Sequence, residues 1–296
     1  MNSAMALEQN EPNSLWHDAW VRLKQDRAAI AGAVIIILLV SAAIFAPLLA
    51  PYDPAIGYME GLSDYGEPMP VSQQFLLGTD HLGRDVLSRL IWGSRISLFI
   101  GIASNLLAIS IAIPIGATAA FVGGWIDTVL MRFTDIVMSF PMLLLAIALA
   151  AVLEPGLGTV VVVISFIYWS YLARIVYSKV KAVKAMEFVT SARAVGASSF
   201  RILVRHILPH LMSEVLVYAT LGIAQTVLTE ASMSYLGVGV RPPTASWGGM
   251  ISEGQNYFRT APWLMLYPGL AIIITVLAFN LLGDGLRDAL DPRSRR

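Results

Sequence analysis

Residues 28–52 of the chain read AAIAGAVIIILLVSAAIFAPLLAPY, a stretch without Asp, Glu, Lys, Arg or His. An α-helix rises about 1.5 Å per residue and the hydrocarbon core of a bilayer is about 30 Å thick, so about 20 apolar residues cross it. A helix also pairs its own backbone N–H and C=O groups, which the bilayer interior requires. The stretch therefore predicts a transmembrane helix, placed at residues 28–50. Its apolar run is longer than that of a signal peptide, so we expect an uncleaved anchor.

Further uncharged runs follow along the chain. One of them, residues 215–229, is short and reaches spanning length only if the helix continues past Glu230. The complete set of predicted spans is residues 28–52, 96–126, 136–153, 155–173, 211–236 and 260–283, with a loop near Gly123 and Gly124. We therefore predict an all-α polytopic membrane protein with six transmembrane helices.

The composition agrees with this prediction. Apolar and aromatic residues make up 56% of the chain and charged residues 14%, whereas an ordinary soluble domain has about 25% charged residues. The 20 Lys and Arg balance the 20 Asp and Glu, so the chain lacks the basic excess of a nucleic-acid-binding protein. The absence of cysteine excludes disulfides, thiolate metal sites and cysteine nucleophiles.

Positive charge predicts the orientation, because cytoplasmic loops carry the excess of Lys and Arg. Six spans place both termini on one side. If that side is the cytoplasm, the basic residues outside are limited to Arg84, Arg89, Arg95, Arg241 and Arg259. We therefore predict cytoplasmic segments at residues 1–27 and 286–296 and an extracytoplasmic segment at residues 51–94. Within residues 14–27, aromatic and basic side chains fit either a helix lying in the interface or an extension of the first span.

Several chemistries are missing from the sequence. No Gly-Lys dipeptide occurs, so there is no G-x-x-x-x-G-K-[ST] phosphate loop, and we expect no ATP site of this kind in the chain. His206 and His210 have a spacing that can place two ligands on one helix face, but Pro209 lies between them and no third ligand is evident. We predict no metal site and no catalytic residue. An intramembrane enzyme is the weakest alternative, since no nucleophile–base pair stands out.

Glu230 is the clearest ionisable residue inside a predicted span, and such residues are functional candidates because they are costly in a membrane. We favour a polar contact with a partner helix or with the wall of a pathway. A position at the outer boundary is a second interpretation. Proton coupling is a third, and it would make the chain a stand-alone proton-coupled carrier.

The basic segment after the fourth span has an internal pattern. Residues 186–196 predict a short helix that breaks at Gly196, and a second helix with Ser198 or Ser199 as its cap leads to Pro209. Two short helices joined at a glycine form a surface that a partner can push. Composition alone favours an ordinary cytoplasmic loop.

The spacing of this segment resembles the EAA loop of the membrane subunits of bacterial ABC importers. The family pattern is E-A-A, three residues, G, nine residues and I-x-L-P. Thr190, Ser191 and Ala192 stand at the E-A-A positions, Gly196 at the glycine, and Leu208-Pro209 at the end. Thr190, Ser191 and His206 depart from the pattern in residue type, while the spacing is kept.

Longer stretches resemble the C-type subunit of the dipeptide/oligopeptide/nickel permeases. They are LGTDHLGRDVLSR at residues 77–89, SYLGVGVRPPTASWG at 234–248 and LAFNLLGDGLRDALDP at 277–292. The resemblance implies a type I ABC importer permease fold, with a five-helix core at residues 95–285 and a location in the bacterial inner membrane. It implies a transport subunit that is not itself an enzyme.

The resemblance also implies partners and a substrate. The partners are a homologous B-type permease, two ATPase domains on separate or fused chains, an extracytoplasmic solute-binding protein and the lipid bilayer. ATP and Mg would be bound by the ATPase subunits, with no cofactor on this chain. The expected substrates are di- and oligopeptides, with nickel or another small solute as the alternative.

Finally, the resemblance assigns roles to residues. The coupling segment, residues 187–209, would contact an ATPase through Glu187, Phe188, Thr190, Ser191, Ala192, Arg193, Gly196, Ala197, Leu208 and Pro209. Candidates for the translocation pathway are Tyr218, Gln225, Thr226, Thr229 and Glu230. The loop expected to face the binding protein contains Gly237, Gly239, Pro242, Pro243 and Trp247.

Overall fold

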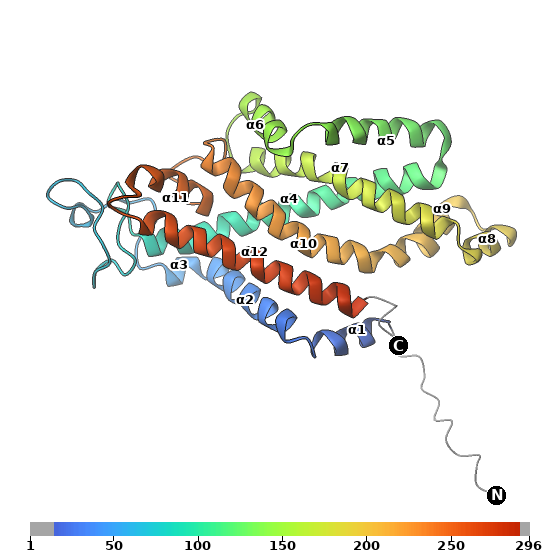
Figure 1. Cartoon of the computed structure of the whole chain (residues 1–296), viewed down its shortest axis with the longest axis horizontal. Helices are drawn as coiled ribbons and strands as arrows, with labels where there is room; N and C mark the ends of the chain where they lie inside the picture. The colour runs from blue at the N-terminus through green and yellow to red at the C-terminus, as the bar shows by residue number, and fades with distance from the viewer. Residues whose placement is uncertain (1–14, 291–296) are drawn as a thin grey trace, which may run out of the picture.

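The computed structural model describes residues 15–290, which form helices and connecting loops without a strand (Figure 1). The long helices lie roughly along one axis. The loops of residues 51–85 and helix α11 are at one end, called the α11 end, and helices α8 and α9 are at the other, called the α8 end. Residues 1–14 of the predicted N-terminal segment and 291–296 of the predicted tail lie outside the described residues.

The helices follow the apolar runs of the sequence. The longer ones are α2 (Arg27–Ile44), α4 (Val86–Val122), α5 (Gly124–Ser139), α6 (Met142–Val152), α7 (Leu157–Lys184), α10 (Leu208–Tyr235) and α12 (Trp263–Leu290). The shorter ones are α1 (Leu15–Leu23), α3 (Ala46–Leu49), η1 (Met59–Gly61), α8 (Glu187–Ala194), α9 (Ser199–Arg201), η2 (Ile202–Ile207), α11 (Trp247–Gly254) and η3 (Gln255–Tyr257).

Five helices in the described part are long and apolar enough to cross a membrane, and α5 with α6 makes a sixth if the bent pair is one span. The pair bends by 92°, which corrects the expectation of a continuous span at residues 136–153. Phe140 is extended and Pro141 follows it. Proline restricts the preceding residue to extended conformations and lacks an N–H, so the helix stops there. The expected turn is present, because Gly123 and Gly124 have φ values of 76° and 62°.

Close approaches between helices need glycine at the contact. A Cβ on Gly116 of α4 would lie 2.4 Å from the carbonyl oxygen of Ala173 on α7. In α12, Gly283 meets Leu221 of α10 and Gly285 meets Ala29 of α2. The helix continues through both glycines because α12 packs there against α10 and α2. The last helix therefore runs on to Leu290, past the predicted end at residue 283.

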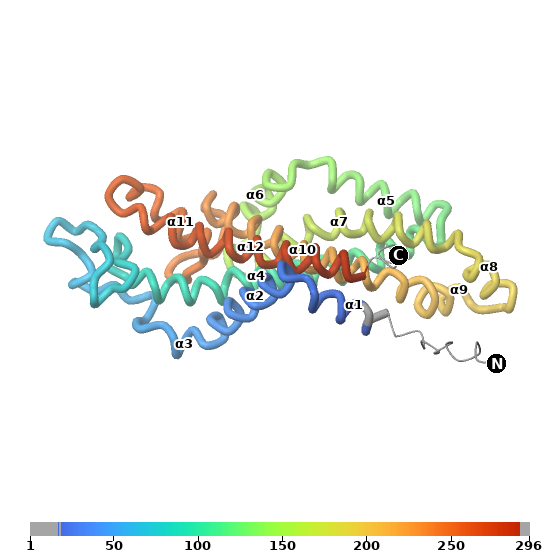
Figure 2. Tube along the Cα trace, turned by 60° about the horizontal axis from the view of Figure 1, so that its bottom comes forward, coloured from blue at the N-terminus to red at the C-terminus, as the bar shows by residue number. Residues whose placement is uncertain are grey.

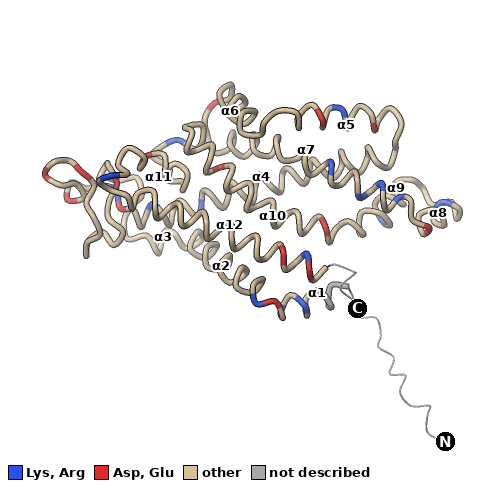
Figure 3. The backbone as a smooth tube through the Cα atoms, in the orientation of Figure 1, with Lys and Arg blue, Asp and Glu red and all other residues tan. Residues whose placement is uncertain are grey.

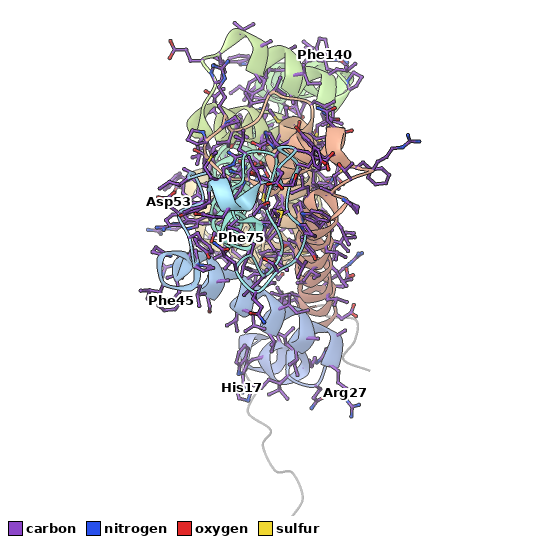
Figure 4. The ribbon with its side chains drawn as sticks, turned by 90° about the vertical axis from the view of Figure 1, so that its left-hand side faces the viewer. His17, Arg27, Phe45, Asp53, Phe75 and Phe140 are labelled. Carbon is purple, nitrogen blue, oxygen red and sulfur yellow. The ribbon has the colours of Figure 1, made fainter. Side chains whose placement is uncertain are left out.

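Helix α1 is a separate element and not an extension of α2. Asp26 caps α2 by accepting hydrogen bonds from the backbone N–H groups of Ala28 (2.8 Å) and Ala29 (3.2 Å). Figures 1 and 2 both place α1 beside the end of α12 at the α8 end. Figure 4, viewed from the α11 end, shows His17 and Arg27 on the opposite side of the molecule from Phe140, so α1–α2 and the α5–α6 bend flank the core on opposite sides.

Charges gather toward the two ends of the molecule and leave most of the middle uncharged (Figure 3). Two of the five arginines expected outside, Arg84 and Arg89, are buried at the α11 end in ion pairs with Asp80 and Glu253. Helix α1 and the end of α12 both lie at the α8 end, as an even number of spans requires. The cytoplasmic placement of that end stays a prediction.

Candidate coupling surface and translocation cavity

Helix α8 has one buried side chain, Val189, which packs on the bundle. Val189 is 1% exposed and lies in a cluster with Val180 and Val183 of α7, Ile202 and Ile207 of η2, and Leu211 of α10. The segment is therefore packed onto the ends of α7 and α10. Val189, Ile202 and Ile207 were missing from the sequence prediction, although their apolar type was a visible signal.

The end of α8 has a specific hydrogen-bond pattern. The N–H of Gly196 donates to the carbonyl of Arg193 (3.0 Å), and the N–H of Ala197 donates to the carbonyl of Ala192 (3.1 Å). These two bonds are the 5→2 and 6→1 bonds of a Schellman motif, which needs a left-handed residue after the helix. Gly196 has φ 86° and provides it. A Cβ at Gly196 would meet nothing within 4 Å, so the glycine is needed for its backbone conformation and not for close approach.

The second part of the coupling segment continues into α10. Ser198 caps α9 by accepting from the N–H of Arg201, as predicted. The chain then forms a π-helical turn over Ile202–Ile207 and enters α10 with Pro209 in its first turn. The sequence predicts a second helix as far as Pro209 and a separate span from residue 211, whereas the chain is helical through Pro209. A wider turn before Pro209 and its position in the first turn of α10 both accommodate a residue without an N–H.

The outer face of the coupling segment mixes apolar and polar side chains. Val195 is 89% exposed and Phe200 77% exposed. Phe188 is partly exposed and lies edge-on to His210, with 4.9 Å between ring centroids. The other exposed residues of the predicted set are Glu187, Thr190, Ser191, Arg193, Gly196 and Pro209. Ala192, Ala197 and Leu208 instead pack on the buried cluster around Val189.

A cavity of about 470 Å³ lies among α4, α6, α7, α10 and α12. Tyr218 and Gln225 line it, as two of the five predicted pathway residues. Sequence reasoning missed the remaining polar lining, which is contributed by Asn105, Tyr168, Tyr171 and Asn280. These residues come from three other helices, so no single stretch of sequence marks them as neighbours.

The other three predicted pathway residues do not line this cavity. Glu230 is 0% exposed and accepts hydrogen bonds from Ser97 of α4 (3.0 Å) and Ser234 (2.7 Å). Thr226 donates to the carbonyl of Gly101 on α4 (2.8 Å). Thr229 lies 3.4 Å from the hydroxyl of Tyr168. The three residues are buried where α10 packs on its neighbours, and their assignment to the pathway stays a prediction.

Two residues of the loop expected to face the binding protein point inward. Trp247 is 1% exposed and donates from Nε1 to the carbonyl of Leu90 (3.0 Å). Gly239 is buried, and a Cβ there would overlap the side chain of Ser234. Packing against α4 and α10 covers Trp247 and Gly239, and their place in the loop expected to face the binding protein stays a prediction. Gly237, Pro242 and Pro243 are exposed.

An ion-pair cluster fixes the α11 end. Asp80 accepts from Arg84 (2.6 Å) and Arg89 (3.2 Å), and Glu253 of α11 accepts from the same two arginines (2.6 and 2.8 Å). Asp80, His81 and Glu253 also form the one group of metal-ligand types found among the described residues. The two guanidinium groups already pair with its carboxylates, so the arrangement is that of a structural ion-pair cluster.

Comparisons with known proteins match almost all of the chain. Residues 112–296 match the family described as "binding-protein-dependent transport system inner membrane component". Residues 14–70 match the "N-terminal TM domain of oligopeptide transport permease C".

Individual relatives are similar over most of the chain. The chain is 40% identical to a glutathione transport system permease protein GsiD of Pectobacterium atrosepticum, over 94% of this chain and 91% of the relative. It is also 40% identical to the oligopeptide transport system permease protein OppC of Bacillus subtilis, over 96% and 91%. The fold is similar to a chain of the MetNI methionine ABC transporter, with a TM-score of 0.58, 18% identity, and coverage of 69% of this chain and 96% of that chain.

Proposed function

The chain belongs to the family of binding-protein-dependent transport system inner membrane components, and from this membership we propose that it carries di- and oligopeptides as one permease subunit of an ATP-driven importer. The family places it among multi-pass proteins of the bacterial inner membrane that are transport subunits and not enzymes. The observation that carries the proposal is the 40% identity, over nearly the whole chain, to permeases named for oligopeptides and for the tripeptide glutathione.

The proposed assembly has the parts that such an importer needs. A homologous B-type permease completes the pathway, two ATPase domains bind ATP and Mg, and an extracytoplasmic binding protein delivers the peptide. The absence of a Walker phosphate loop from this chain supports the placement of ATP hydrolysis on partners.

The coupling segment is suited to receive force from an ATPase. Its exposed face, from Phe188 to Val195, presents apolar groups that can fill a groove on a partner. Val189 fixes α8 to the ends of α7 and α10, and the Schellman bonds at Gly196 close the helix end. A rigid attachment of this kind transmits a push to α10 as a rigid-body movement.

The pathway is assigned to the 470 Å³ cavity, with Tyr218 and Gln225 on α10 as its predicted members. At the α11 end, Gly237, Pro242 and Pro243 are assigned to contact with the binding protein, since they are exposed and Trp247 anchors the loop from within. ATP binding would shift the permease pair between inward-open and outward-open states.

The proposal is tested by reconstitution. The tagged chain, purified from its own host in mild detergent, should bring a second permease and a P-loop ATPase, and proteoliposomes of this complex with its binding protein should import dipeptides when ATP is present. Uptake of nickel or another small solute in place of peptides would support the alternative substrate. ATP-independent uptake by the chain alone would contradict the importer assignment and support a proton-coupled carrier.

The coupling role is tested with one substitution on the exposed face. Val195→Asp should leave insertion and assembly unchanged, because Val195 is 89% exposed, but it should lower transport per ATP hydrolysed. The matched control is Thr128→Asp in α5, which is also exposed and lies outside the coupling segment. Normal coupling in Val195→Asp would contradict the assignment of this face.

A further inference from the structure

The hydrogen-bonding groups around the 470 Å³ cavity are all neutral. Its polar lining consists of three carboxamides and three phenol hydroxyls, from four helices: Asn105, Tyr168, Tyr171, Tyr218, Gln225 and Asn280. The rest of the lining is apolar. No Asp, Glu, His, Lys or Arg is among the described lining residues. The cavity can therefore form hydrogen bonds without selecting a charge.

Asn105 is a buried polar residue in the wall of the cavity. Its side chain is 0% exposed, and its Nδ2 donates to the carbonyl of Ala219 (2.5 Å). Its Oδ1 is buried without a hydrogen-bond partner among the described residues. A Cβ at Gly222 would lie 2.4 Å from this oxygen, so the glycine allows α10 to pack closely against the Asn105 side chain. An unpaired buried acceptor has a free-energy cost, so Asn105 is a polar residue kept in the wall although its oxygen has no partner within the described part of this chain.

We propose that this cavity binds the main chain of a peptide in transit and is indifferent to the charge of its side chains. This inference rests on the proposed function. Each peptide unit carries one N–H donor and one C=O acceptor. Carboxamides and hydroxyls offer both a donor and an acceptor, so they match peptide units of any sequence. The volume lies in the range of small-molecule sites, about 300–1,000 Å³.

The same lining distinguishes a peptide from a metal ion. Divalent transition metals in proteins are held by imidazole, thiolate or carboxylate ligands. None of these groups lines the cavity among the described residues. A neutral lining also lacks the strong point charges that would hold an oppositely charged peptide and slow its release. The chemistry of the wall therefore fits the amide groups shared by all peptides.

The test places a charge in the cavity and reads the charge preference of transport. Gln225 is exposed to the cavity on α10. In proteoliposomes of the whole transporter with its binding protein, uptake of a neutral, an acidic and a basic dipeptide is measured for wild type, Gln225→Glu and Gln225→Lys. Gln225→Glu should lower uptake of the acidic dipeptide relative to the basic one by about tenfold, through like-charge repulsion at short range. Gln225→Lys should produce the opposite shift.

Gln225→Glu and Gln225→Lys control for each other. A folding defect lowers the uptake of all three dipeptides equally, so it cannot reverse the ratio of acidic to basic dipeptide uptake. Gln225→Leu should lower the uptake of all three dipeptides alike, while Leu228→Gln, exposed on the same helix outside the cavity, should leave them unchanged. Unshifted ratios in both charge variants would overturn the inference. If the wild-type transporter imports no dipeptide at all, the proposed function itself fails. This outcome is distinct from unshifted uptake ratios, which would overturn only the inference about the cavity.

Discussion

Glu230 is a carboxylate held by hydroxyl groups and not by a cation. Ser97 and Ser234 donate to its two oxygens, and Ser97 also accepts from the backbone N–H of Trp247 (3.2 Å). The carboxylate thus connects α10 to α4, and through Ser97 it connects to the first turn of α11. This geometry supports a polar contact between helices, the favoured interpretation of the sequence, over proton coupling.

Replacement of Glu230 separates these two roles. Glu230→Gln keeps the size of the side chain and replaces one acceptor oxygen by an NH2 donor, to which one serine hydroxyl can turn as the acceptor, so we expect most of the ATP-driven uptake to be retained. Glu230→Leu leaves buried hydroxyls without a partner and should destabilise the protein by about 1–3 kcal/mol. Uptake in proteoliposomes and thermal unfolding in detergent measure the two effects. Loss of uptake in a stably folded Glu230→Gln would favour a titrating carboxylate.

Gly196 is a second residue whose role is set by local geometry. Its positive φ costs an ordinary L-residue about 1–2 kcal/mol, whereas Asn adopts this conformation more readily. We expect Gly196→Asn to retain coupling and Gly196→Val to lower transport per ATP hydrolysed, since only the second disrupts the Schellman end. Both variants have open space for the side chain, so steric overlap does not confuse the comparison. Equal coupling in the two would show that the left-handed conformation is not required.

At the scale of elements, α7 and α10 carry the coupling segment between them and are joined by an ion pair. Lys179 donates to Glu214 (2.6 Å) on the α8 side of the cavity, about two turns from it along α7 and about one turn along α10. Leu172 and Tyr218 lie between this pair and the cavity, lining both the cavity and a smaller void beside the pair. The pair therefore stands between the cavity and the coupling segment.

A charge exchange tests the importance of this pair. Both side chains are about two-fifths exposed, so the pair should contribute no more than about 1 kcal/mol to stability. Lys179→Glu places two carboxylates together and should lower transport, and Glu214→Lys in the same chain should restore it. Uptake in proteoliposomes measures the restoration. A double variant no better than Lys179→Glu would mean that the attraction between α7 and α10 is not what matters.

At the scale of the molecule, the ion-pair cluster joins segments that are far apart in the sequence. Asp80 belongs to the loops of the α11 end, Arg89 to the start of α4 and Glu253 to α11. Arg84 and Arg89 are 3% and 2% exposed. Removal of one member leaves a buried charge without its partner, and such changes typically cost about 3–5 kcal/mol.

We therefore expect Arg89→Met to unfold at a clearly lower temperature than wild type in detergent. The control is Glu60→Gln, an exposed change in the same loops, which should alter stability by less than about 0.5 kcal/mol. Intrinsic fluorescence during heating measures both variants. The same unfolding temperature for Arg89→Met and wild type would show that the cluster does not hold the α11 end together.

The sequence determined the features that depend on local chemistry. Uncharged runs of spanning length predicted the long helices, because the bilayer leaves few other structures possible. The glycine at 196 predicted the end of α8 and the serine at 198 the cap of α9. Proline at 141 is a signal for the α5–α6 bend, but the uncharged run on both sides of it has the length of one continuous span.

The tertiary structure decided what each helix face contacts. Glu230 and Gln225 are five residues apart on one apolar helix, yet one is buried against α4 and the other lines the cavity. Trp247 lies in a stretch rich in glycine and proline, a composition typical of exposed loops, yet its side chain is covered by α4. Helical periodicity fixes which residues share a face but not which neighbour covers that face. The neighbour is set by packing among helices distant in sequence, and the cavity lined by five of them exists only once they meet.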